Sequence, residues 1–193
     1  MNRKEALDIV RKHIKSESLV HHMQAVEAAM VAYAEELGQD TEVWGAAGLL
    51  HDYDWEIHPD VDSHPLEGIA YLREQGVSEE ILHAIAAHAT HTDYPRESLL
   101  DKYLYACDEI TGMITAVALV RPSRSLYDLE ASSVKKKWKD KSFAAGTDRD
   151  VMTEGAAEIG IDLWEHVGNV ILAMRKIAPL LSLEGNLPRP AEL

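Results

Sequence analysis

Residues 42–52 read Glu-Val-Trp-Gly-Ala-Ala-Gly-Leu-Leu-His-Asp, a run that is almost entirely apolar until its last two residues. A helix that lacks a polar face is buried on all sides, so this run predicts a helix at the centre of the fold. Asp40 or Thr41 is suited to cap its first turn. His51 and Asp52 then stand where a buried helix ends, which is where two neighbouring side chains can reach one point.

The sequence on both sides of this run is also helical, because its apolar residues recur at the spacing of one helix face. Gly38 stands where a helix C-cap favours glycine, and Ser98 with Asp101 resembles a capping box. No segment reads convincingly as a strand. The pattern predicts an all-α bundle of about eight helices, at residues 3–14, 19–37, 42–51, 63–75, 78–88, 98–120, 147–159 and 162–176.

Composition limits the partners of this bundle. The chain of 193 residues has a net charge of −14, and such an acidic surface repels extended nucleic acid. Cys107 is the single cysteine, so no intrachain disulfide can form, and a cytoplasmic protein is expected. No run of 18 apolar residues occurs, which predicts no membrane span. A small anionic substrate remains compatible, because a bound metal can reverse the local charge.

Six residues of the chain form a candidate metal site. Each lies at or near a predicted helix end or inside a mostly apolar helix. A carboxylate such as Asp108, among apolar neighbours, must be paired, protonated or coordinated. Any one of these histidines alone is more often an ordinary core or surface group, so the argument rests on the ordered set: His22, His51, Asp52, His64, His88 and Asp108.

Four imidazoles and two carboxylates suit two divalent ions. Mn, Fe, Co, Ni or Zn match this mixture, and Mg is compatible with the carboxylates. We expect Asp52 to bridge the two ions through its two oxygens. Two bridged ions activate a shared water, so a metal-bridging hydroxide is the expected nucleophile toward a phosphoryl group.

The order of these residues resembles the H…HD…H…H…D signature of the HD superfamily of metal-dependent phosphohydrolases. The segment 48–52 resembles its GLLHD core, 64–68 the HPxxG box of the HD-GYP branch, and 106–109 the closing aspartate element. The likeness covers roughly residues 15–120, and the chain is similar to small bacterial HD or HDIG-domain proteins. It implies an HD helical fold and two metals, but no particular substrate.

Two departures separate the chain from the HD-GYP branch. That branch has a further histidine directly after the fourth one, where this sequence has Ala89, and residues 92–95 read Thr-Asp-Tyr-Pro instead of a GYP motif. Cyclic di-GMP hydrolysis is therefore disfavoured. Some relatives with the same six ligands are mixed-valent di-iron oxygenases, and a non-catalytic regulatory module that binds metal is a further alternative.

Several residues outside the ligand set are candidates for supporting roles. Glu109 could orient a histidine ligand or simply pair with a lysine. A lysine cluster and Arg121 could hold substrate phosphate, whereas the plainer interpretation is a solvated surface and a helix stop. The candidates for substrate binding are Lys136, Lys137, Lys141 and Arg121.

The sequence thus predicts one HD domain over residues 1–193, with a metal-binding core at about 15–120 and a C-terminal helical extension at about 121–180. The expected function is hydrolysis of a nucleotide or another small phosphate ester. The expected partner is a small-molecule phosphate substrate, and a homodimer is compatible with the sequence.

Overall fold

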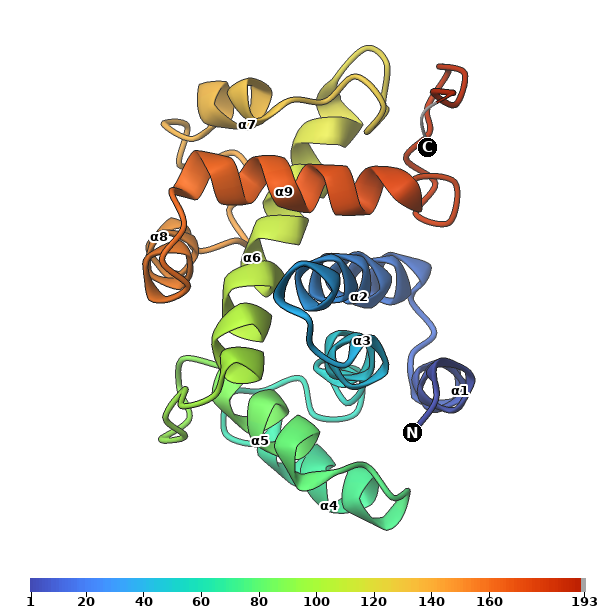
Figure 1. Cartoon of the computed structure of the whole chain (residues 1–193), viewed down its shortest axis with the longest axis vertical. Helices are drawn as coiled ribbons and strands as arrows, with labels where there is room; N and C mark the ends of the chain where they lie inside the picture. The colour runs from blue at the N-terminus through green and yellow to red at the C-terminus, as the bar shows by residue number, and fades with distance from the viewer. Residues whose placement is uncertain (192–193) are drawn as a thin grey trace. The chain divides into compact units, whose positions relative to one another are not determined.

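The computed structural model describes residues 1–191 of the chain. Over these residues it contains only α-helices and no strand, which confirms the all-α prediction (Figure 1). The helices are α1 (Arg3–His13), α2 (Glu17–Leu37), α3 (Thr41–Leu50), α4 (Leu66–Glu74), α5 (Glu79–His88), α6 (Leu99–Val120), α7 (Ala131–Lys137), α8 (Arg149–Glu158) and α9 (Leu163–Lys176). The chain divides into two compact units, Met1–Tyr105 and Ala106–Leu193, and α6 begins in the first and continues in the second.

Capping residues mark helix ends where the sequence predicts them, as at the start of α3 and at the end of α2. The Asp40 carboxylate accepts the backbone N–H groups of Glu42 and Val43 at the start of α3. Gly38 ends α2 in the left-handed conformation, with φ of 66°, which costs glycine little. The predicted start of the fourth helix at Ser63 is wrong: α4 begins only at Leu66, and no side chain caps it.

Helix α7 is the element that the sequence pattern did not predict. It has seven residues and ends in three consecutive lysines, so it is too short and too polar to show a helical stripe. Its one buried side chain is Val134. This helix raises the count in residues 1–191 to nine, one more than the approximate prediction.

In the first unit, α3 is the central helix and packs against α1, α2 and α5, while α4 packs against α5 (Figure 1). All residues of α3 from Trp44 to Leu50 are buried, as its composition predicts. Gly48 lets α3 approach α2 closely, because a Cβ atom there would lie 2.8 Å from the backbone of Glu27. The His51-Asp52 pair is therefore placed by a helix with little freedom to shift.

In the second unit, α7 and α8 each pack against α9. Arg175 of α9 donates to the carbonyl oxygens of Leu126 and Leu129, which ties the segment before α7 to α9. His166, also on α9, is fully buried, and its Nε2 atom lies 2.9 Å from the carbonyl oxygen of Ala106. Hydrogen bonds from these two side chains thus connect α9 to Ala106 and to the segment before α7.

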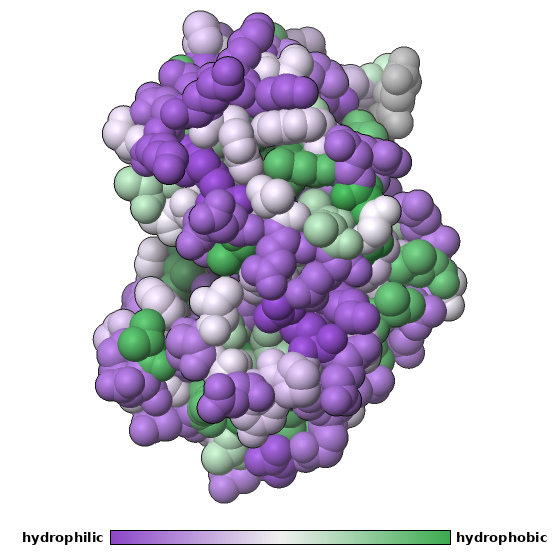
Figure 2. Space-filling model, turned by 90° about the vertical axis from the view of Figure 1, so that its left-hand side faces the viewer, coloured by the Kyte–Doolittle hydropathy of each residue, from purple (hydrophilic) through white to green (hydrophobic). Residues whose placement is uncertain are grey.

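Among residues 1–191, one helix, α6, is long and apolar enough to cross a membrane by length and composition alone. In the structure, 61% of its most apolar window is buried inside the protein, as in a core helix. The face drawn in Figure 2 shows mostly hydrophilic residues, with hydrophobic ones in small separate groups. Burial of α6 by other parts of the chain is thus sufficient to account for its apolar sequence.

Gly48→Ala should destabilise the protein, because the new methyl group meets the backbone of α2 and not a flexible side chain. We expect a loss of about 1–3 kcal/mol in the free energy of unfolding, measured by urea denaturation followed by circular dichroism. The matched control is Gly168→Ala on α9, where an added Cβ meets no atom within 4 Å. That variant should gain roughly 0.5–1 kcal/mol, and equal effects of both substitutions would contradict the close approach.

Candidate metal centre

Five of the six predicted ligands lie together in the first unit, and Asp52 is at their centre. Its carboxylate side chain is only 15% exposed. The two histidines nearest its Oδ2 atom are His51 and His22, whose Nε2 atoms lie at 3.5 and 3.7 Å. The two nearest its Oδ1 atom are His64 and His88, at 3.3 and 3.5 Å. Each oxygen of one carboxylate thus faces its own pair of imidazoles.

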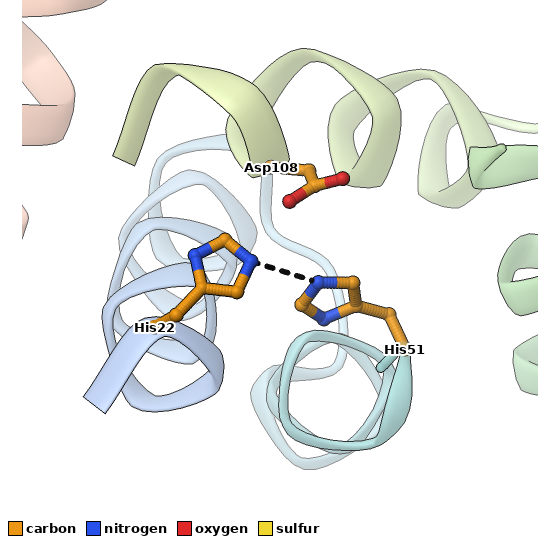
Figure 3. A group of neighbouring side chains, drawn as sticks. All are labelled: His22, His51 and Asp108. Atoms are coloured by element: carbon orange, nitrogen blue, oxygen red, sulfur yellow. Dashed lines mark hydrogen bonds between the residues drawn. The ribbon is translucent and has the colours of Figure 1, made fainter. Parts of the chain in front are cut away.

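His22 and His51 approach each other from different helices. His22 is carried by α2 and His51 directly follows α3, and a nitrogen atom of each ring points toward the other ring (Figure 3). The two Nε2 atoms lie 3.2 Å apart. Asp108, labelled in the same view, is carried by the part of α6 that belongs to the second unit.

The remaining ring nitrogens of three histidines have partners that fix the orientation of each ring. His51 Nδ1 donates to the carbonyl oxygen of Gly48 at 2.8 Å, and His88 Nδ1 donates to that of Ile85 at 2.6 Å. His64 Nδ1 lies 2.8 Å from a carboxylate oxygen of Asp54. Such bonds are typical of metal-binding histidines, because they set the tautomer and leave Nε2 as the ligand atom.

The distances between these groups fit metal coordination. Two ligand atoms about 2.1 Å from one ion lie about 3.0 Å apart at a right angle and about 3.4 Å apart at the tetrahedral angle. The contacts of 3.3–3.7 Å around Asp52 fall close to this range. His51, Asp52 and His88 also offer ligand atoms that all lie within 4.8 Å of one another. The donor set therefore fits divalent ions.

The charges of the cluster are strongly coupled. Burial opposes ionisation of Asp52, but the positive charge of His51 and hydrogen bonds from His64 and His88 outweigh it and hold the pKa of Asp52 well below its usual range. Burial likewise opposes protonation of His64, yet its bonds to Asp52 and Asp54 raise the pKa of His64 to about 9. The cluster thus keeps an ionised carboxylate ready for a cation.

Asp54 is the supporting residue whose role the sequence left undetermined. It is fully buried and holds His64, and its second oxygen has no hydrogen-bond partner. Gly68 gives it room, since a Cβ atom at that position would lie 2.7 Å from this oxygen. A second aspartate two positions after Asp52 was the only signal in the sequence.

The other predicted site residues all belong to the second unit. Glu109 accepts the backbone N–H of Asp148 just before α8. Arg121 bonds to Ser133 and pairs with Asp128 at 2.6 Å, so its guanidinium holds the segment after α6. Of the lysines, Lys136 and Lys137 end α7, and Lys141 follows it. Roles of these residues in substrate binding stay predictions.

Comparison with known proteins places this site in a family. The family model for the HD domain matches residues 19–113. A protein named Ribonuclease Y from Desulfotalea psychrophila (strain LSv54 / DSM 12343) is 31% identical over 181 residues, covering 92% of this chain and 33% of that relative. No solved structure matches the chain.

Further relatives of the same name match a shorter part. Those from Oleidesulfovibrio alaskensis and Cutibacterium acnes are 36% identical over 98 and 110 residues, which is 50% and 55% of this chain. The chain spans at most about a third of the length of these relatives, because the matches cover 33%, 18% and 19% of them. The family-model match and the histidine-aspartate cluster agree: residues 19–113 of the chain belong to the HD domain family.

Proposed function

We propose that the chain is a phosphohydrolase that binds two divalent ions and acts on a nucleotide or another small phosphate ester. One observation carries this proposal: the two oxygens of Asp52 face two different pairs of histidines. A single carboxylate placed in this way is suited to bridge two ions. The hydrogen bonds at the Nδ1 atoms of His51, His64 and His88 also support a metal site, because they orient the rings.

Asp108 is proposed as the sixth ligand. It follows the segment of α6 that begins in the first unit, and its position in the ordered motif agrees with that of a closing ligand. Two bound ions would lower the pKa of a shared water and neutralise charge on the phosphoryl group. The chain itself then contributes an ionised Asp52 and four imidazoles, three of which are oriented by hydrogen bonds to their Nδ1 atoms.

The substrate proposal rests on charge and on size. The net charge of −14 opposes a long polyanion, whereas a small phosphate ester needs only the local positive charge of bound ions. We propose a protein that works in the cytoplasm with a small-molecule substrate and no membrane. Lys136, Lys137, Lys141 and Arg121 are proposed phosphate contacts, and a homodimer is compatible with this function.

A second candidate is hydrolysis of a phosphodiester bond in RNA. It is favoured by the relatives named Ribonuclease Y, one of which matches 92% of this chain. A dinucleotide offered beside a nucleoside monophosphate separates the two candidates. Release of inorganic phosphate from the monophosphate supports the first, and cleavage of the dinucleotide alone supports the second.

Asp52→Ala should abolish both metal binding and hydrolysis, because it removes the group that faces all four histidines. The measurement is elemental analysis of the purified chain together with a phosphate-release screen over nucleotides and sugar phosphates. Asp62→Asn, an exposed acid in the same loop, is the control and should keep metal and activity. A wild-type protein that remains free of metal and inactive after addition of Mn, Fe, Co or Ni would refute the proposal, and bound iron without phosphatase activity would favour an oxygenase.

Metal affinity should rise with pH between about 6 and 9. The pKa of His64 is about 9, so at neutral pH this ring holds a proton that an incoming ion must displace. Calorimetric titration with Mn²⁺ in two buffers of different ionisation enthalpy measures this release. Asp54→Asn removes one of the carboxylates that raise the His64 pKa, so the rise in metal affinity should begin at lower pH. The variant also removes the group that orients His64, so its metal affinity above pH 9 should be about 10–100-fold weaker than that of the wild type. An unchanged pH profile in Asp54→Asn would contradict the coupling.

A further inference from the structure

Trp55 is a large aromatic side chain that remains 41% exposed beside the metal centre. Its indole ring lies 4.8 Å from the imidazole of His64, with the two ring planes at 87°. A perpendicular contact occupies at most one of the two faces of the indole. At least one face of the indole is therefore not covered by His64, which is a predicted metal ligand.

The backbone fixes Trp55 in the same turn as Asp52. The N–H of Trp55 donates to the carbonyl oxygen of Asp52 at 3.0 Å. The N–H groups of Ile57 and His58 both donate to the carbonyl oxygen of Asp54, at 2.8 and 2.7 Å. These three turn bonds hold the backbone that carries Trp55 close to Asp52.

The exposure of Trp55 belongs to a local pattern. Three more large apolar side chains close to it in sequence are exposed, namely Ile57 (47%) and Val61 (63%) in the same loop and Leu66 (40%) at the start of α4. Of these four side chains, Trp55 contacts a predicted ligand, His64. An exposed aromatic side chain beside a polar centre is typical of a binding site.

The charges of the segment that carries Trp55 restrict what can bind beside it. From Asp52 to Leu72 the chain has no lysine or arginine, and Asp60, Asp62 and Glu67 are exposed carboxylates. Such a surface repels the successive phosphates of a nucleic acid strand. It accepts a neutral aromatic group, because an indole face binds a nucleobase by stacking whatever its sequence.

We propose that Trp55 is the surface on which the base of a single nucleotide stacks while its phosphate lies at the cluster around Asp52. In a nucleoside monophosphate, one ribose separates the base from the phosphate. This arrangement matches an indole that contacts the ligand His64 but is not itself a ligand. This inference deepens the proposed phosphohydrolase function and rests on it. Trp55 acts as a specificity-determining residue for nucleotides over sugar phosphates.

The test uses the full chain with AMP and ribose 5-phosphate, which share a phosphate and a ribose and differ by the base. Trp55→Ala should raise the KM for AMP roughly tenfold or more and change that for ribose 5-phosphate by less than about twofold. Trp55→Phe should restore most of the affinity, because it keeps an aromatic face. Val61→Ala, in the same loop and more exposed, is the matched control and should behave as wild type.

Binding is also measured without turnover. AMP should quench the tryptophan fluorescence of the wild-type chain and of Val61→Ala, and the quenching should disappear in Trp55→Phe, although three other tryptophans remain. Metal content is measured in every variant, because loss of metal in Trp55→Ala would show that Trp55 only supports His64. That result, or equal KM changes for both substrates, overturns the inference.

The outcomes separate the two proposals. If no phosphate is released from either compound by the wild-type chain, the proposed function fails, while quenching by AMP that depends on Trp55 still supports the stacking surface. If both compounds are hydrolysed and AMP gives no quenching, the function stands and the inference fails. A dinucleotide that quenches while AMP does not would assign the indole to the end of a strand and overturn the choice of a single nucleotide.

Discussion

The buried carboxylate of Asp52 is the group on which the first unit depends. An isolated charge in this position would be costly, and four imidazoles around it offset that cost only while they are held in place. Helix α3 delivers Asp52, and Gly48 allows α3 to lie against the backbone of α2, which carries His22. The fold and the site therefore have one common requirement, which is the close approach of α2 and α3.

The orientation of the ligand rings follows from the ends of helices. His51 follows α3 and His88 is the last residue of α5, and each donates its Nδ1 proton to a carbonyl oxygen three residues earlier. Carbonyl groups in the last turn of a helix have no partner within the helix, so they are available for this purpose. A histidine at a helix C-terminus thus gives an unpaired carbonyl oxygen its hydrogen-bond donor. The same bond orients the ring, so that its Nε2 atom is left to bind a metal.

Much of the fold was predictable because it is encoded locally. Helical spacing and caps such as Asp40 and Gly38 predicted eight helices, and the apolar run of α3 predicted its complete burial. Helix α7 was not predicted, because its seven residues end in lysines and show no apolar stripe. In the site, the ordered histidines and Asp52 were predicted, but the bond from Asp54 to His64 was not, since it depends on how the loop after α3 turns. That turn is set by tertiary contacts, including the room left for Asp54 by Gly68.

The central claim is that Asp52 bridges two ions, one at each oxygen. The most direct measurement is a crystal structure of the chain loaded with Mn²⁺, with anomalous diffraction used to locate the metal. The account predicts two anomalous peaks, one between Oδ2 of Asp52 and the pair His22 and His51, the other between Oδ1 and the pair His64 and His88. A single peak, or two peaks of which neither lies within bonding distance of Asp52, would contradict it.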